Sequence, residues 1–314
     1  MIVDLPDTSV SKIARELVNV REEGGAVALG RVLTLIIATS HGLEEEAIEA
    51  ANDASREHPM RVIVLITRED GPSKLDAQIR VGGDAGASEV VVLRASGGAA
   101  SNAEALVTGL LLPDAPVVAW WPDHPPVEPA SSPIGRIASR RITDASTLPY
   151  DSSRLALLGQ GYNPGDTDLA WTRLTHWREQ LAAVLDQPPY EPVTEVEVIG
   201  SGSSPSTGLL AAWLRLMLDV PVTWRYAPAD EWEHGIRSVR LSRPGGDVLL
   251  ERSTPVDAKL TQPGQPEHDL VLPRRTLREC LAEELRRLGP DLLYGRVITD
   301  GWKLLATDSP ARDA

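Results

Sequence analysis

The stretch with the clearest potential for ligand binding is the glycine- and serine-rich segment Gly200-Ser-Gly-Ser-Ser-Pro-Ser-Thr-Gly208. It follows an expected strand and opens an expected helix, the setting in which backbone amides can cradle a phosphate. A dinucleotide fingerprint needs glycine where Pro205 stands, and a Walker loop needs lysine where Leu209 stands. A self-capped loop is therefore the favoured interpretation. The alternative is anion binding through Gly200, Gly202 and Ser203, with Arg140 and Arg141 as further candidates.

Two other places bring reactive side chains together. Asp123 and His124 put a carboxylate beside an imidazole just past an expected strand end, where sites in α/β proteins tend to lie. A catalytic pair would need a nucleophile or a second base, and none is implied nearby, so a loop histidine is favoured. Arg136, Arg140 and Arg141 form a basic cluster, for which ion pairing or solvation is favoured over a phosphate clamp.

Motifs of familiar enzyme chemistry are absent from the sequence. No Gly-x-Ser-x-Gly elbow occurs, and the six histidines include no pair at helical metal-ligand spacing. The single cysteine, Cys280, cannot form an internal disulfide, and its place beside a leucine stripe favours a packed structural thiol. We therefore expect no catalytic residue, no metal and no cofactor.

Length and charge narrow the class of protein further. The chain has 314 residues, which favours two domains with ample core. Its formal net charge of -14 is shared by both halves, so nucleic acid or an anionic membrane would be approached against repulsion. The sequence shows no signal-peptide pattern and no apolar stretch long enough to span a membrane. We expect a cytoplasmic protein with neither kind of partner.

The first half of the chain alternates helical and strand patterns. Apolar runs rich in Val, Leu and Ile predict strands that are covered on both faces, and amphipathic stretches predict the helices between them. The expected helices span 9–21, 43–57 and 102–112. The expected strands span 31–39, 60–67, 75–81, 89–95 and 116–122, with a glycine-rich turn at 82–86, an irregular excursion at 123–135 and a transition at 136–165.

The second half repeats this alternation. A long helix over 168–186 precedes strands at 195–199, 220–226, 236–242, 248–252 and 269–272, with helices at 207–218 and 276–288 and a polar tail. The prediction is an α/β protein with two α/β domains, 1–165 and 166–314, each a mixed β-sheet with flanking helices. The similar element order of the halves raises the hypothesis of an ancient duplication.

Several segments together resemble OpcA, the glucose-6-phosphate dehydrogenase assembly protein family of some bacteria. The most specific are Trp120-Trp121-Pro at a strand end and Asp168-Leu-Ala-Trp-Thr-Arg-Leu-Thr-His-Trp-Arg178. Arg141-Ile-Thr-Asp144 and the closing leucine-rich helix add to the resemblance, which runs from the first helix to about residue 305. The resemblance implies a non-catalytic partner that promotes assembly or activation of glucose-6-phosphate dehydrogenase, and so NADPH production in the oxidative pentose phosphate pathway.

The chemistry of the aromatic residues suggests where such a partner would bind. The chain has eight Trp and no Phe, and Trp and Arg dominate the energy of protein interfaces. The candidate contacts are Trp120, Trp121, Asp123, Trp171, Arg173, Trp177 and Arg178. Helical and strand periodicity favour the alternative that some of these tryptophans are core. The competing function is a sugar-phosphate or nucleotide sensor that uses Gly200 to Gly208; the partner itself is expected to be oligomeric.

Overall fold

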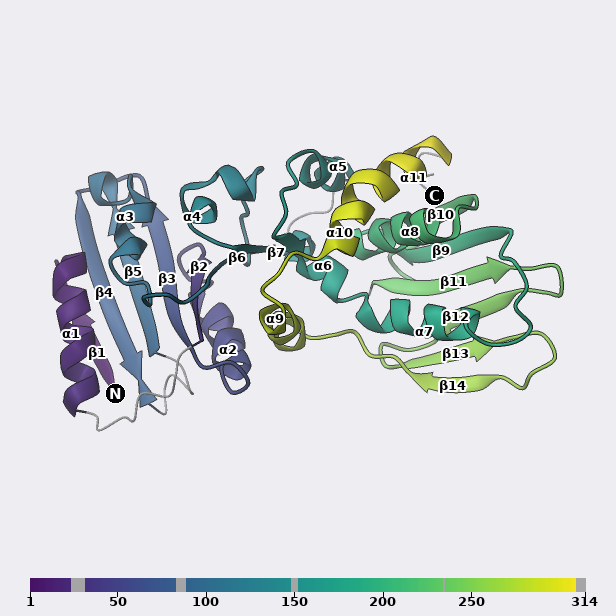
Figure 1. Cartoon of the computed structure of the whole chain (residues 1–314), viewed down its shortest axis with the longest axis horizontal. Coiled ribbons are helices and arrows are strands. Elements are labelled where there is room, and N and C mark those ends of the chain that lie inside the picture. The colour runs from purple at the N-terminus through teal and green to yellow at the C-terminus, as the bar shows by residue number, and fades with distance from the viewer. Residues whose placement is uncertain (24–31, 83–88, 148–151, 234, 309–314) are drawn as a thin grey trace. The chain divides into compact units, whose positions relative to one another are not determined.

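The computed structural model describes residues 1–23, 32–82, 89–147, 152–233 and 235–308 (Figure 1). The chain divides into two compact units. Unit 1 comprises Met1–Asp144, Gly165–Thr167 and Leu277–Pro290; unit 2 comprises Ala145–Pro164, Asp168–Thr276 and Asp291–Ala314. The predicted boundary between residues 165 and 166 would divide the chain into two continuous domains. Each of the observed units is instead made of three separate segments of the chain. The expected glycine turn at 82–86 lies, beyond Gly82, outside the described residues.

Unit 1 contains a sheet of eight strands in the order β1-β4-β5-β3-β2-β6-β7-β8. The strands are β1 (Ile2–Leu5), β2 (Leu33–Ala38), β3 (Met60–Arg68), β4 (Lys74–Val81), β5 (Glu89–Ser96), β6 (Val117–Trp121), β7 (Arg140–Thr143) and β8 (Asp166–Asp168). From β5 to β7 the five neighbouring strands are parallel. At one edge β4 runs antiparallel to β5, and β1 runs antiparallel to β4. Their apolar runs are buried on both faces, as the sequence predicts.

The five parallel strands follow the order 3-2-1-4-5 of doubly wound nucleotide-binding sheets. The chain builds outward from β2 through β3 to β5, then crosses over and continues on the other side of β2 with β6. A topological switch point therefore lies between β2 and β6. In open sheets of this kind, ligands bind outside the carboxyl ends of the strands at that point.

Five helices of the described chain accompany the sheet of unit 1; amphipathic patterns predict four of them, and the short α4 begins within the expected irregular excursion. They are α1 (Val10–Glu23), α2 (Glu44–Ala54), α3 (Ala103–Thr108), α4 (Pro133–Arg136) and α9 (Leu277–Arg286). Ile13 and Leu17 of α1 share a buried core with Ile63 of β3. Helix α9 packs on α2, far from it in sequence, and carries the fully buried Cys280.

A buried carboxylate at the start of β5 is held by two arginines. Glu89, whose side chain is 1 % exposed, lies 2.8 Å from the guanidinium groups of both Arg21 and Arg61. Arg61 also donates a hydrogen bond to the carbonyl of Leu110. Since a buried charge is costly unless paired, this cluster stabilises unit 1 only while all its members are present.

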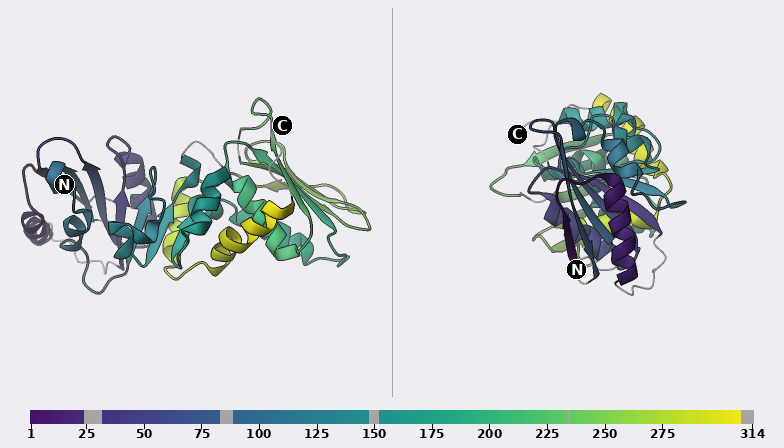
Figure 2. Two further views of the ribbon diagram at one scale, coloured as in Figure 1. Left: turned by 90° about the horizontal axis from the view of Figure 1, so that it is seen from above. Right: turned by 90° about the vertical axis from the view of Figure 1, so that its left-hand side faces the viewer.

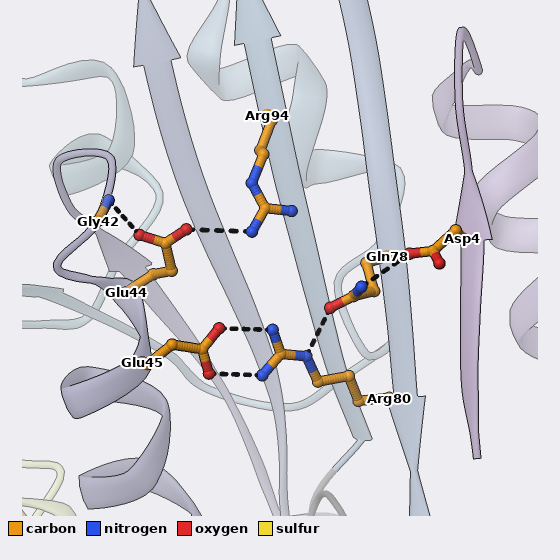
Figure 3. A network of polar contacts seen from close by, with 7 residues as sticks. All are labelled: Asp4, Gly42, Glu44, Glu45, Gln78, Arg80 and Arg94. Carbon is orange, nitrogen blue, oxygen red and sulfur yellow. Dashed lines mark hydrogen bonds and ion pairs between the residues drawn. The ribbon is translucent and has the colours of Figure 1, made fainter.

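A second polar network joins the N-terminus of α2 to the strands beside it (Figure 3). Glu44 accepts hydrogen bonds from Arg94 at 3.0 Å and from the backbone N–H of Gly42 at 2.5 Å. Glu45 accepts two hydrogen bonds from Arg80, both at 2.7 Å. Burial alone would raise the pKa of Glu44, but these hydrogen bonds and its own backbone N–H outweigh it and lower that pKa below 4.5.

Unit 2 is built on a six-stranded sheet in the order β10-β9-β11-β12-β13-β14. Its strands are β9 (Glu195–Ser201), β10 (Val222–Ala227), β11 (Ile236–Ser242), β12 (Val248–Arg252), β13 (Asp257–Thr261) and β14 (His268–Val271). Only β9 and β10 pair in parallel; all other neighbours are antiparallel. The alternation of buried and exposed residues along these strands leaves one face apolar and one face polar.

Helices gather on one side of this sheet (Figure 2). They are α5 (Ser152–Gln160), α6 (Leu169–Thr172), α7 (Thr175–Leu185), α8 (Pro205–Leu218), α10 (Leu292–Arg296), the π-helical η5 (Val297–Gly301) and α11 (Trp302–Asp308). Their apolar residues and the inward residues of the strands form one core. Arg252 of β12 is buried over the ring of Trp177, 5.2 Å from its centroid, and burial with the nearby charge of Arg274 lowers its pKa to about 10.

The predicted α/β class is confirmed, but several elements differ from expectation. The two sheets differ in strand order, since the first has a parallel centre and the second is mainly antiparallel, so they lend the hypothesis of a duplication no support. The long helix expected over 168–186 is broken, because Asp168 ends a strand and caps α6, and α7 begins only at Thr175. The polar tail expected after residue 288 is helical. Its Gly301 lies close to α8, because a Cβ atom at this position would stand 2.7 Å from the carbonyl oxygen of Ala212.

Removal of the charge of Glu89 should destabilise unit 1 strongly. In Glu89→Gln, the buried guanidinium of Arg61 loses its counter-charge, and we expect the free energy of unfolding to fall by roughly 3 kcal/mol. Urea denaturation followed by circular dichroism measures the change. The exposed Glu22→Gln is the control, with an effect of about 0.5 kcal/mol or less. Equal stabilities of the two variants would show that the pair is not energetically important.

The network at Glu44 predicts a dependence of stability on pH. The pKa of Glu44 is lower in the folded chain than in the unfolded chain, so its contribution is fully present above the ordinary value of 4.5 and is lost as pH falls through the folded value. The difference in unfolding free energy between wild type and Glu44→Gln should therefore shrink between pH 7 and acidic pH. A difference that stays constant across that range would contradict the assignment.

Candidate functional site

A cavity of about 830 Å³ opens at the carboxyl ends of the parallel strands of unit 1. We call it the carboxyl-edge cavity. Its walls come from the residues that end or follow four strands: Thr39, Ser40 and His41 after β2, Thr67 and Arg68 in β3, Arg94 to Ser96 in β5, and Trp121, Asp123 and His124 at and after β6. Lys74 and Asp76 of β4 and Ser132 to Ile134 near α4 complete it. Its place matches the switch point between β2 and β6.

Asp123 joins the two loops that meet at the switch point. Its Oδ2 accepts a hydrogen bond from the backbone N–H of Ser40 at 2.9 Å and lies 3.1 Å from Nδ1 of His124. Burial would raise the pKa of this carboxyl, but the contacts with Ser40 and His124 outweigh burial and lower the pKa below 3.8. Asp123 is therefore an anion at neutral pH.

Two buried polar atoms of the cavity wall have no hydrogen-bond partner within the chain. One is Oδ1 of Asp123, a residue that is 7 % exposed, and the other is the hydroxyl oxygen of Thr39. Buried polar atoms in folded proteins are nearly always paired with protein, water or ligand. Both atoms are covered by the surrounding chain, so they lie within the wall and do not present a hydrogen-bonding group to the open cavity.

The remaining charged groups of the wall already have local partners. Arg68 pairs with Asp70 at 3.1 Å, Lys74 with Asp76 at 2.8 Å, and Arg94 with Glu44. The first two pairs are well exposed, and exposed ion pairs contribute little energy and exchange readily with other anions. Within the described part of the chain, no cluster of three His, Cys, Asp or Glu side chains could hold a metal ion.

The N-terminus of α2 lies where doubly wound sheets hold a pyrophosphate on free backbone N–H groups. In this chain the carboxylate of Glu44 takes that place, since it accepts the N–H of Gly42 while Arg94 neutralises it (Figure 3). Glu45 and Glu46 add further negative charge to the first turn. A phosphate at this position would meet carboxylates instead of free donors.

The aromatic side chains predicted to contact a partner are packed inside their own units. Trp120 and Trp121 lie in β6, and Trp171 and Trp177 lie on α6 and α7; each is at most 5 % exposed. Trp121 also borders the carboxyl-edge cavity beside Asp123. The indole N–H of Trp171 donates to Asp291 at 2.9 Å. Contact with a partner through these residues stays a prediction, and their observed contribution is to packing.

The two predicted contact arginines on the helices of unit 2 are more accessible. Arg173 and Arg178 are half-buried, and the guanidinium of Arg178 stacks on Trp171 at 3.7 Å from the ring centroid. Such stacking fixes the plane of the guanidinium, and Arg178 also donates a hydrogen bond to the hydroxyl of Thr175 at 3.2 Å. Of the predicted contact set, these two side chains offer the most surface to another protein.

The anion-binding candidates have partners of their own. Arg140 is bound by Glu284 and by the carbonyl oxygen of Gly289, and Arg141 is bound by Asp166. In the Gly200 to Gly208 segment, the backbone N–H of Ser203 donates to the hydroxyl of Ser201 at 3.2 Å. A Cβ atom at Gly200 would stand 2.3 Å from the Thr207 hydroxyl oxygen, and Gly202 lies against the ring of Tyr226. The arrangement agrees with a self-capped loop; anion binding there stays untested.

Sequence reasoning identified Asp123 and His124 as a strand-end pair but missed the groups that complete the cavity. Thr39 and Ser40 follow a run that was correctly predicted as a buried strand, so their position at a carboxyl edge was foreseeable. The pairing of β2 with β6 could not be predicted from the sequence. The two strands are separated by 78 residues, between Ala38 and Val117, and their pairing depends on the order of all the strands in the sheet.

Comparison with known proteins gives matches over most of the chain. Residues 51–160 match the family described as glucose-6-phosphate dehydrogenase subunit N-terminal domain, and residues 164–298 match the corresponding C-terminal domain. A Synechocystis protein named for OpcA of the OxPP cycle is 28 % identical over 151 residues. That match covers 45 % of this chain and 31 % of the relative, so the chain spans about a third of the relative's length.

Two solved structures show a looser likeness. Glucose-6-phosphate 1-dehydrogenase from Mycobacterium avium is 12 % identical with a TM-score of 0.42, and the match covers 90 % of this chain and 93 % of that one. UDP-N-acetylglucosamine 3-dehydrogenase GnnA from Acidithiobacillus ferrooxidans is 7 % identical with a TM-score of 0.41, covering 87 % and 97 %. Such scores establish neither fold nor activity. The two family matches do decide the family: the chain belongs to the OpcA family of glucose-6-phosphate dehydrogenase assembly proteins.

Proposed function

We propose that this chain is a non-catalytic partner that binds glucose-6-phosphate dehydrogenase and promotes its active oligomer in the oxidative pentose phosphate pathway. The observation that carries the proposal is the match of both parts of the chain, residues 51–160 and 164–298, to the two domains of the assembly family. The name of the Synechocystis relative points to the same pathway. An activator of this kind needs a surface that binds the active state of the enzyme better than the inactive state.

The carboxylate of Glu44 at the N-terminus of α2 supports a role without hydride transfer. Unit 1 has the strand order of a nucleotide-binding sheet, but Glu44 takes the place of the pyrophosphate and is itself held by Gly42 and Arg94. Displacement of this carboxylate would break its hydrogen bonds and leave it beside the incoming phosphate. The proposal therefore assigns nicotinamide chemistry to the dehydrogenase and binding to this chain.

The uncovered face of the six-stranded sheet is the surface we assign to the partner. Helices pack on the opposite face, so the outward side chains of neighbouring strands stand free of them. Arg225 of β10 and Arg240 of β11 flank Glu197 of β9, at 3.2 and 3.7 Å, and each arginine is about half exposed. Charged groups spread over a broad sheet suit a partner with complementary charges, because they speed association and set the register of binding. Arg173 and Arg178 remain the second candidate patch.

A titration of glucose-6-phosphate dehydrogenase from the same organism tests the proposal. Addition of this chain to an assay of NADPH formation should raise the rate, or lower the apparent KM for glucose 6-phosphate, and the effect should saturate. Loss of both arginines in the double variant Arg225→Ser and Arg240→Ser should raise the concentration needed for half of the effect by about tenfold.

The matched control carries the same change of charge on unit 1. Arg15 and Arg56 are exposed, and the double variant Arg15→Ser and Arg56→Ser should activate like the wild type. Equal weakening by both double variants would mean that net charge, and not the sheet face, governs the effect. No change of rate or KM at any concentration of the wild-type chain would refute an activating role.

A further inference from the structure

We propose that Arg252 and Arg274 of unit 2 bind a phosphate group, carried by the free phosphate ion or by a small phosphate ester. Arg252 is the last residue of β12, and its side chain lies on the face of the sheet that the helices cover, beside Trp177 of α7. The surface assigned to the partner is the opposite face. The inference therefore does not depend on the proposed function.

Arg252 differs from the other buried arginines of the described chain because it has no counter-charge. It is 4 % exposed, and no hydrogen bond or ion pair from the described residues reaches its guanidinium. The other buried arginines each bind a buried carboxylate: Arg61 binds Glu89, Arg140 binds Glu284, and Arg141 binds Asp166. A buried charge is costly unless it is paired, and stacking over Trp177 offsets only part of that cost.

A second guanidinium lies at the same end of the sheet. Strands β12 and β14 both run antiparallel to β13, so their carboxyl ends meet at one edge. The backbone N–H of Leu272 donates to the carbonyl of Val256 at 2.7 Å, which holds the chain after β14 beside the turn between β12 and β13. The exposed Arg274 follows two residues later. Burial and the charge of Arg274 together lower the pKa of Arg252 to about 10.

The carboxylates nearest to Arg252 in the sequence lie on the other face of the sheet. Glu251 precedes it in β12, and successive side chains of a strand point to opposite faces. Asp257, the first residue of β13, is exposed on that outer face, where it accepts a hydrogen bond from the hydroxyl of Thr254 at 2.9 Å. Neither carboxylate acts as the counter-charge of Arg252, so an anion from solution is the group that would supply it.

A phosphate group suits this pair of arginines in charge and in shape. Of the three guanidinium nitrogens of Arg252, only Nε is covered by the surrounding chain, so the two terminal nitrogens can still be reached. A guanidinium donates two parallel hydrogen bonds to the oxygens of a phosphate. A phosphate ester carries a charge of about −1.5 to −2 at neutral pH, which balances two arginines, whereas a carboxylate balances only one. The low exposure of Arg252 restricts the ligand to a small group.

Thermal unfolding of the full chain in chloride and in phosphate of equal ionic strength tests the inference. In chloride, Arg252→Met should unfold at the temperature of the wild type or above it, because an apolar side chain of similar length replaces an unpaired buried charge. In inorganic phosphate, at about ten times its dissociation constant, the unfolding temperature of the wild type should rise by about 3 °C. That of Arg252→Met should not change between the two salts.

Two further variants separate phosphate binding from folding and from net charge. Arg237, which pairs with Glu231 at 3.1 Å, provides the control: Arg237→Met loses the same charge and should keep the phosphate-dependent rise. Arg274→Gln changes an exposed side chain, so it should fold like the wild type and bind phosphate about tenfold more weakly by isothermal titration calorimetry.

The outcomes decide between a phosphate site and a merely structural arginine. No phosphate-dependent rise in the wild type, or an equal rise in Arg252→Met, would overturn the proposal. If Arg252→Met does not fold, an unchanged affinity of Arg274→Gln for phosphate would overturn it as well. Titration with glycerol 3-phosphate distinguishes the two sources of the group, since tighter binding than that of inorganic phosphate assigns the site to an ester and weaker binding assigns it to the free ion.

Discussion

The carboxylate of Glu44 at the start of α2 is the interaction on which this account of unit 1 depends. Arg94 and the N–H of Gly42 hold it at the helix end that a nucleotide-binding sheet uses for phosphate, and burial makes its release costly. The first turn of α2 therefore presents a paired carboxylate where such sheets present free backbone donors. The adjacent cavity lies at the switch point between β2 and β6.

The two units pack their sheets in different ways. Unit 1 buries a parallel sheet on both faces, so its exposed chemistry is confined to the strand ends, where loops meet. Unit 2 packs helices on one face of a mainly antiparallel sheet and leaves a broad polar face to the solvent. Unit 1 therefore offers a cavity at its strand ends, and unit 2 offers a polar sheet face. Among the described residues, every helix is too short or too polar to span a bilayer.

Much of the fold could be predicted from the sequence where local pattern and burial agree. The runs that form β2 and β3 are predominantly apolar, and the helices α1 and α8 begin within two residues of the expected positions. The misses occurred where long-range contacts decide. Strand β13, with the sequence DAKLT, is stabilised by pairing with both β12 and β14 rather than by its own composition. The tail became helical because Asp291 caps α10 and Gly301 permits close packing on α8.

The candidate sites illustrate the same limit. Asp123 could be recognised as a strand-end carboxylate, but its bond to Ser40 depends on the crossover that makes β2 and β6 neighbours. Tryptophan is a frequent interface residue, yet Trp120 and Trp171 are fully packed, since strand and helix periodicity place them inward. Residue type indicated which chemistry was available, and the tertiary arrangement determined which groups remain accessible.

The central claim is that this chain and glucose-6-phosphate dehydrogenase form a specific complex. Size-exclusion chromatography with light scattering, on each protein alone and on their mixture, measures this most directly. The account predicts a species of larger mass that contains both chains and a dehydrogenase shifted towards its higher oligomer. Elution of both proteins at their separate masses, at concentrations where the dehydrogenase is active, would contradict it.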